Sequence, residues 1–187
     1  SNQHHENSNM NPEEKNTSLI GVYGPWAVSL TEGKLPSLSF RRKEFTNVDD
    51  WRKKARARMA ERLAAPSIGT HPKVTVKKKY EYDGLIIEEV SWQLPYGRPT
   101  EAIILKPKDA KGKLPGILAF HDHGANKYFG NRKITKTSDH GHPVIQDYQR
   151  DYYGGFAWAN EVAKRGYVVI VPDAFPFASR RVLLADV

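Results

Sequence analysis

The sequence predicts an α/β fold: antiparallel edge strands followed by a parallel β-α-β unit, with a helical and irregular extension at the N-terminus. Two observations predict the sheet. Strand-like segments follow one another over residues 74–106 and turn at Asp83-Gly84, which is a strong β-hairpin signal. Later, a helical pattern separates the apolar runs 116–120 and 167–171, which is the order of a parallel crossover.

The N-terminal residues 1–18 are polar, rich in Asn and Ser, and without apolar periodicity, so we expect a disordered leader. Such a polar leader often follows a removed export signal or a lipid anchor. We therefore expect an exported protein, in the periplasm, at the surface or lipid-anchored. Residues 19–40 combine glycines and prolines with aromatic residues, which predicts an irregular segment.

The N-terminal extension, residues 19–70, contains one expected helix. Asn47 or Asp49 can cap it and Pro66 stops it. One face carries an apolar residue every four positions, namely Trp51, Ala55, Met59 and Leu63. The segment 41–62 also holds nine basic residues, so the helix is predicted to be basic and amphipathic.

The second part of the chain, residues 71–187, carries the strands. We expect strands at 74–80, 85–94 and 101–106, then at 116–120 and 167–171. A helix is expected over 155–165, where Gly166 ends it, and a long polar loop before it. The region therefore predicts an α/β-type sheet that lacks further strands.

The composition is that of a globular protein, with 39% hydrophobic and 27% charged residues among 187. No apolar run approaches the ~20 residues of a transmembrane helix. Lys and Arg outnumber Asp and Glu by 29 to 21, so the surface should attract polyanions such as acidic polysaccharides. A nucleic-acid partner is not expected, because no recognition motif accompanies the charge. The absence of cysteine excludes disulfides and thiolate metal sites.

The strand 116–120 ends in His121-Asp122-His123-Gly124, and chemistry in parallel sheets lies at the carboxyl ends of the strands. This ending indicates a hydrolase. A metal site is the alternative, since Asp139, His140 and His142 follow within twenty residues. Their spacing matches no regular ligand pattern, so we expect no metal and no cofactor. A catalytic set from Ser138, Asp139 and His140 is also disfavoured, because adjacent residues do not line up as nucleophile, base and orienter.

Three segments in unbroken order resemble a known family: PTEAIILKP, LPGILAFHDHG and WANEVAKRGYVVIVPDAFPFASRR, over roughly residues 80 to 181. They resemble the N-terminal half of an α/β-hydrolase, closest to the dienelactone hydrolase-like and acetylxylan esterase-like bacterial branch. YGPWAVSLTEGKLPSLSFR is similar to the N-terminal extension of that branch. The resemblance implies a serine carboxylic-ester hydrolase, a carbohydrate esterase acting on acyl or methyl esters of polysaccharides that can be acidic.

The resemblance also implies roles for two residues. The backbone N–H of His123 would donate to the oxyanion hole, and Gly124 would let the backbone approach closely. The family often has HGGG where this chain has HDHG, so Asp122 and His123 are departures. No G-x-S-x-G pentapeptide occurs. The triad is therefore expected in the C-terminal half of the same protein, missing here or a separate chain, and this chain alone is expected to be inactive.

The expected loop after the HDHG sequence carries aromatic and basic residues, which suit a sugar with acid groups. We predict substrate contacts from Tyr128 and Arg132, and from Asp173 at the end of the last strand. The alternatives are that the tyrosines pack the loop and that Asp173 orders its neighbours. A second hypothesis for the whole chain is a non-catalytic glycan-binding or assembly module on the same scaffold.

Overall fold

The computed structural model describes residues 19–187, so the expected leader lies outside the described residues. The chain divides between Pro66 and Ser67 into two compact units, which are described separately. The sequence pattern places this division slightly later, after residue 70. Within the described part, no helix combines the length and the hydropathy that crossing a membrane requires.

The first unit contains short helical turns at Gly21–Tyr23 (η2) and Gly24–Ser29 (α1), and a longer helix at Val48–Leu63 (α2). The Asn47 side chain caps α2, as predicted, because it accepts hydrogen bonds from the N–H groups of the second and third helical residues, at 2.9 and 3.1 Å.

The predicted apolar face of α2 is not buried, which corrects the amphipathic interpretation. No residue of α2 is buried, and the side chains of Met59 and Leu63 are 63% and 72% exposed. Only Trp51 has close apolar packing, with its ring 5.1 Å from that of Phe40 and its indole N–H donating to Leu38 O at 2.8 Å. Within the first unit, the C-terminal half of the stripe is therefore exposed.

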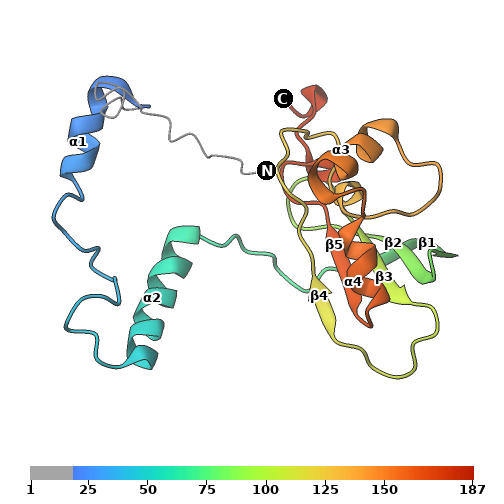
Figure 1. Ribbon diagram of the computed structural model, residues 1–187, viewed down its shortest axis with the longest axis horizontal. Helices are drawn as coiled ribbons and strands as arrows, with labels where there is room; N and C mark the ends of the chain where they lie inside the picture. The colour runs from blue at the N-terminus through green and yellow to red at the C-terminus, as the bar shows by residue number, and fades with distance from the viewer. Residues whose placement is uncertain (1–18) are drawn as a thin grey trace, which may run out of the picture. The chain divides into compact units, whose positions relative to one another are not determined.

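The second unit is built on a mixed five-stranded sheet in the order β1-β2-β3-β5-β4. The strands are Thr75–Tyr82 (β1), Leu85–Trp92 (β2), Thr100–Pro107 (β3), Gly116–Leu118 (β4) and Val168–Pro172 (β5). Pairing is antiparallel from β1 through β2 and β3 to β5, and parallel between β5 and β4. The predicted α/β sheet, with antiparallel edge strands followed by a parallel β-α-β unit, is confirmed (Figure 1).

The predicted hairpin turn joins β1 to β2. Asp83 and Gly84 both have positive φ, 55° and 71°, as a two-residue type I′ turn requires. Tyr82 pairs with Leu85 directly across it. The Asp-Gly sequence therefore sets the register of the first two strands.

The core lies between the sheet and α4, Trp158–Lys164, which contacts β3 and β5 (Figure 1). Successive side chains of a strand point to opposite faces of the sheet, so every second residue of each strand lies on this face. The fully buried residues of this cluster include Leu85, Ile87, Leu105, Val169 and Val171 from the strands and Ala159 and Ala163 from α4. The two alanines allow the helix backbone to approach the sheet.

A further helix, α3 at Pro143–Tyr153, lies where a long loop was expected, so that expectation was wrong. Local signals for it exist: proline at the first turn, a capping side chain from His142, and Gly154 with φ 63° after the last turn. Ile145, Tyr148 and Tyr152 also recur at helical spacing, and the buried residues of the helix are Ile145 and Gln149.

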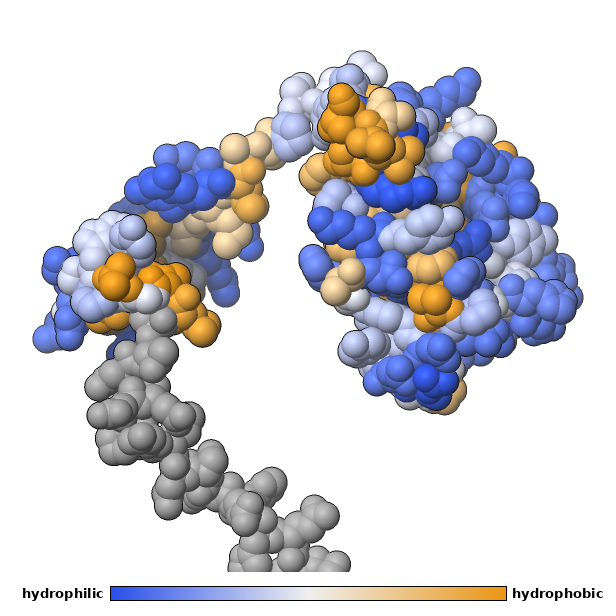
Figure 2. Space-filling view, turned by 90° about the horizontal axis from the view of Figure 1, so that it is seen from above, coloured by the Kyte–Doolittle hydropathy of each residue, from blue (hydrophilic) through white to orange (hydrophobic). Residues whose placement is uncertain are grey.

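Strand β4 is the last strand on its side of the sheet and is paired only with β5 among the described strands. Leu118 and Phe120 nearby are 57% and 60% exposed. The space-filling view shows that apolar side chains reach the surface of this unit in patches between hydrophilic ones (Figure 2). An open, apolar strand edge is able to accept a further strand.

Candidate functional site

The HDHG sequence leaves the sheet at the carboxyl end of β4, and His121 anchors it. The His121 ring is buried, and its Nε2 accepts the N–H of Ala174 at 3.0 Å. The ring proton is therefore on Nδ1, which donates to Asp122 O at 2.9 Å. The ring also packs edge-on against Phe177, at 5.1 Å. His121 thus ties two loops together and has no free nitrogen for acid-base work or metal binding.

His123 is exposed, unlike His121. Its Nδ1 accepts the N–H of Ala125 at 3.1 Å, and its ring lies 5.4 Å from Phe177. Its own backbone N–H donates to no acceptor in the described part of the chain. A free N–H at the end of a parallel strand is the group that an oxyanion hole uses, and its role here stays a prediction.

Asp122 is the centre of a hydrogen-bond network that links this loop to α3. The hydroxyl of Tyr148 donates to one carboxylate oxygen and that of Tyr153 donates to the other. Burial opposes ionisation of Asp122, but the two hydroxyls and the charge of Lys133 outweigh it and lower its pKa. Burial, followed by the bond to Asp122, raises the pKa of Tyr153 to about 12 and raises that of Tyr148 as well.

Gly124 lies against the same network and cannot carry a side chain there. Its φ is +46°, and a Cβ would lie 1.7 Å from the hydroxyl oxygen of Tyr148 and 2.6 Å from a carboxylate oxygen of Asp122. Inside the protein, the group that the Gly124 backbone approaches closely is the Asp122–Tyr148 pair. Its close approach to a substrate stays a prediction.

Lys133, in the 3-10 turn Asn131–Lys133 (η3), is fully buried beneath the loop. Its Nζ donates to His123 O at 2.9 Å and to Asp122 O at 3.3 Å, and lies 4.5 Å from the centre of the Phe177 ring. Burial lowers its pKa, and the charge of Asp122 opposes that shift. Sequence reasoning missed Lys133, because nothing in the sequence distinguishes this lysine from the many exposed ones.

The carboxylate of Asp173, which follows β5, is occupied by protein donors. One oxygen accepts the N–H of Asn131 at 2.7 Å; the other accepts the hydroxyl and the N–H of Ser179 at 2.6 and 3.2 Å. Asp173 is 2% exposed. Asp173 therefore joins the loop after β5 to η3. This is the alternative given above, in which Asp173 orders its neighbours.

Removing this clamp should cost stability. We expect Asp173→Ala to lower the free energy of unfolding by about 3 kcal/mol, because one buried and two half-buried donors lose their charged acceptor. The measurement is urea denaturation of the chain. Asp109→Ala, on an exposed loop, is the control and should cost less than about 0.5 kcal/mol. Equal stability of the two variants would show that Asp173 holds nothing in place.

The three residues predicted to contact substrate, Tyr128, Arg132 and Asp173, line one cavity of about 140 Å³. It is smaller than the ~300 Å³ at which ligand pockets begin. Arg132 is bound to Glu89 at 2.9 Å and to the hydroxyl of Thr137. Burial opposes ionisation of Glu89, but the bonds from Arg132 and Tyr80 lower its pKa. Arg132 is thus engaged in a protein ion pair.

Tyr128 also faces a larger cavity of about 410 Å³. The Arg181 guanidinium lies 4.9 Å from the centre of its ring, and the exposed rings of Tyr128 and Phe175 both border the cavity. The remaining lining residues are Lys127, Pro176 and Val182, so no carboxylate among the described residues borders it. Two loops that leave the carboxyl ends of β4 and β5 thus form a basic, aromatic surface.

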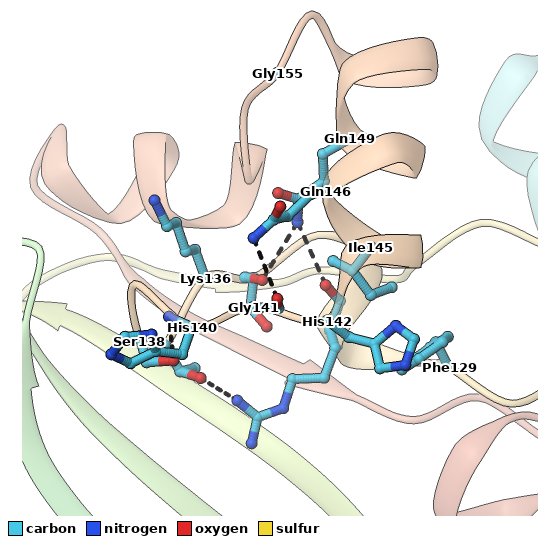
Figure 3. Close-up of a pocket in the computed structure, with 13 residues that line it drawn as sticks. Phe129, Lys136, Ser138, His140, Gly141, His142, Ile145, Gln146, Gln149 and Gly155 are labelled. Atoms are coloured by element: carbon cyan, nitrogen blue, oxygen red, sulfur yellow. Dashed lines mark hydrogen bonds between the residues drawn. The ribbon is translucent and has the colours of Figure 1, made fainter.

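A third cavity, of about 400 Å³, lies between α3 and the loop before it (Figure 3). Its wall is held by the Gln149 amide, which donates to the carbonyl oxygens of Arg132, Lys133 and Thr135. His140 and Lys136 lie on one side of it, and His142 and Phe129 lie together on the other (Figure 3). Its ionisable groups therefore do not converge on one point.

The alternative catalytic set of Ser138, Asp139 and His140 and the alternative metal site are not formed among the described residues. The Asp139 carboxylate accepts the Tyr82 hydroxyl at 2.8 Å, and Ser138 Oγ accepts the backbone N–H of His140 at 3.3 Å. The three adjacent residues thus do not form a nucleophile, base and orienter. Over residues 19–187, no three His, Asp or Glu side chains are grouped as metal ligands.

The comparisons with known proteins bear on the fold. No protein-family model matches the sequence, and no curated protein matches it. A solved structure from Bacteroides fragilis, described as a "putative acetyl xylan esterase", superposes with a TM-score of 0.64 at 20% identity, over 90% of this chain and 41% of that chain. This chain has the same α/β fold. It spans less than half the length of that protein.

A second solved structure, a methylesterase, matches at 19% identity over 74% of this chain and 26% of that chain. Its TM-score of 0.43 is too low to bear on the fold.

Proposed function

We propose that this chain forms the oxyanion-hole part of a serine carboxylic-ester hydrolase that acts on acyl or methyl esters of a carbohydrate. One observation carries the proposal: the His123 N–H is free at the carboxyl end of β4, in a loop held by His121, Asp122 and Lys133. A donor fixed before substrate arrives stabilises the developing oxyanion without reorganisation.

The substrate is proposed to be an ester of an acidic polysaccharide. Tyr128 and Phe175 offer exposed aromatic faces for sugar rings, and Lys127 and Arg181 offer positive charge beside them. No carboxylate of residues 19–187 borders this cavity, so a negatively charged sugar would meet attraction only. The net charge of +8 acts in the same direction over longer distances.

The nucleophile and the rest of the triad are proposed to belong to the C-terminal half of the same protein, as a continuation or as a separate chain. Its first strand would pair with the open edge of β4 and cover Leu118 and Phe120. The serine would then lie beside the HDHG loop, and this chain alone would be inactive. We further propose that the protein is exported, where it would meet its polysaccharide.

The N–H of His123 can be tested directly. In the protein that carries the nucleophile, His123→Pro removes this donor and should lower kcat for a chromogenic acetate ester by about 10²-fold or more. His123→Ala is the matched control: it keeps the N–H and should lower kcat less than about tenfold. Equal activity of the two variants, with unchanged circular dichroism, would exclude the N–H of His123 as an oxyanion donor.

The second candidate is a non-catalytic glycan-binding module, which the basic, aromatic surface of Tyr128, Phe175 and Arg181 favours. It predicts salt-sensitive retention of the chain on a uronic-acid or sulfated glycan column. It also predicts no esterase activity after a C-terminal half is added. Activity gained on that addition would decide for the esterase.

A further inference from the structure

Lys133 is the most deeply buried cation in the described part of the chain, with an exposed fraction of 0%. Burying an ammonium group is costly unless hydrogen bonds or charges compensate. No direct ion pair of residues 19–187 includes Lys133, although the charge of Asp122 nearby partly compensates its ammonium. Its direct partners are two carbonyl oxygens and the faces of the Phe177 and Tyr148 rings. Because the hydrogen bonds of this buried ammonium go to two backbone carbonyl oxygens, it fixes the orientation of both carbonyl groups.

The two carbonyls belong to consecutive peptides. Lys133 Nζ holds Asp122 O at 3.3 Å and His123 O at 2.9 Å. In a planar trans peptide the C=O and the following N–H point in opposite directions. The N–H groups of His123 and Gly124 must therefore both point away from Lys133. Neither of them donates to an acceptor in the described residues.

Other contacts remove the remaining freedom of this loop. The Nδ1–H of His121 is a second donor to Asp122 O, at 2.9 Å. The Tyr148 hydroxyl blocks the space beside Gly124, where a Cβ would lie only 1.7 Å from it. Lys133 itself is held through its own carbonyl, which accepts the Gln149 amide of α3 at 3.2 Å. The Lys133 ammonium thus connects the HDHG loop to η3 and, through Gln149, to α3.

We propose that Lys133 is a positioning residue that presents the N–H groups of His123 and Gly124 as an adjacent pair of donors for one small oxyanion. The proposal rests on the oxyanion role given to this loop, and it adds Gly124 N–H as a donor and a buried ammonium as the cause. Lys133 does not touch the substrate. It acts by fixing the orientation of the two peptide groups whose carbonyl oxygens it binds.

The test uses NMR spectra of the full 187-residue chain labelled with ¹⁵N, titrated with methylphosphonate as the oxyanion probe. In the wild type, the amide resonances of His123 and Gly124 should shift saturably. Lys133→Met keeps an apolar stem without the ammonium and should weaken this response by about tenfold or more. Lys136→Met, an exposed lysine three residues away, is the matched control and should behave as the wild type.

A chemical rescue separates positioning from packing. The chain has no cysteine, so Lys133→Cys can be alkylated selectively with 2-bromoethylamine in denaturant and refolded. The resulting side chain has nearly the length of lysine and carries an ammonium. It should restore the response of both amides to methylphosphonate, whereas Lys133→Cys alkylated with a neutral reagent of similar length should not. This comparison also decides the matter if Lys133→Met fails to fold.

The outcomes separate the two proposals. If methylphosphonate does not shift the His123 and Gly124 amide resonances of the wild type, the oxyanion role of the loop is wrong. The positioning role of Lys133 is then wrong as well. A full response in folded Lys133→Met, or with the neutral alkyl group, overturns only the positioning role of Lys133. Loss in both neutral variants and recovery with the ammonium supports it.

Discussion

Replacing Asp122 by Asn should lower the free energy of unfolding by about 2 kcal/mol, because it removes a half-buried charge that two phenols and a lysine surround. The two carboxylate oxygens accept the hydroxyls of Tyr148 and Tyr153, and an amide offers an acceptor to only one of them. The charge that offsets the buried ammonium of Lys133 is also lost. A variant this unstable should lose the fixed geometry of the HDHG loop.

Urea denaturation of the chain measures the effect. Asp151→Asn is the control, since Asp151 lies on the exposed face of α3 and pairs with Arg150 at the surface. Its cost should be below about 1 kcal/mol. If both variants unfold at the same urea concentration, the Asp122 network does not organise the loop.

Acid should reduce the difference between wild type and Asp122→Asn. The pKa of Asp122 is lower in the folded chain than its ordinary value of 3.8, mainly because the tyrosine hydrogen bonds outweigh burial. The stabilisation is therefore fully present above that ordinary value and disappears as pH falls through the lowered pKa. Unfolding free energies measured from neutral pH downward should converge below pH 3.8.

Gly124→Ala should have a larger effect, about 3 kcal/mol or more. A φ of +46° costs an alanine about 1 kcal/mol. The rest comes from the collision of its Cβ with the hydroxyl of Tyr148 and the carboxylate of Asp122, which would have to separate. The measurement is the urea midpoint, together with the loss of the hydrogen-bonded Tyr148 signal in NMR spectra.

Gly112→Ala isolates the backbone contribution. Gly112 has φ +77°, but no atom lies within 4 Å of the place that an alanine Cβ would take, so its replacement should cost only about 1 kcal/mol. Adding Tyr148→Leu to Gly124→Ala removes the colliding ring and should make the two changes cost less together than the sum of each alone. A simple sum would show that the two residues do not meet.

The sheet could be predicted from the sequence because its signals are local. The strand-like apolar runs of β2 and β3 predict these strands, and Asp83-Gly84 sets the turn between β1 and β2. The position of the HDHG sequence at a strand end follows from the same pattern. Helix α3 does carry Ile145, Tyr148 and Tyr152 at helical spacing, but the polar residues between them were interpreted as a loop.

The candidate site was predictable only in part. The sequence places His121 after the strand, but only the structure shows that its ring accepts the Ala174 N–H and so has a structural role. Tyr128, Arg132 and Asp173 do border one cavity, but Arg132 and Asp173 are engaged with Glu89 and Ser179. Arg132 and Glu89 lie far apart in the chain, so no local sequence pattern predicts their ion pair.

The sequence by itself determined the strand segments along the chain, the hairpin and the place of the HDHG loop, because apolar patterns and turn chemistry act between neighbouring residues. Only the tertiary structure decided how that loop is held. Lys133 lies ten residues beyond His123, and Tyr148 and Tyr153 lie 26 and 31 residues beyond Asp122. They meet because η3 and α3 fold back over the end of β4. Which lysine is buried, and which peptide N–H groups remain free, depends on that packing.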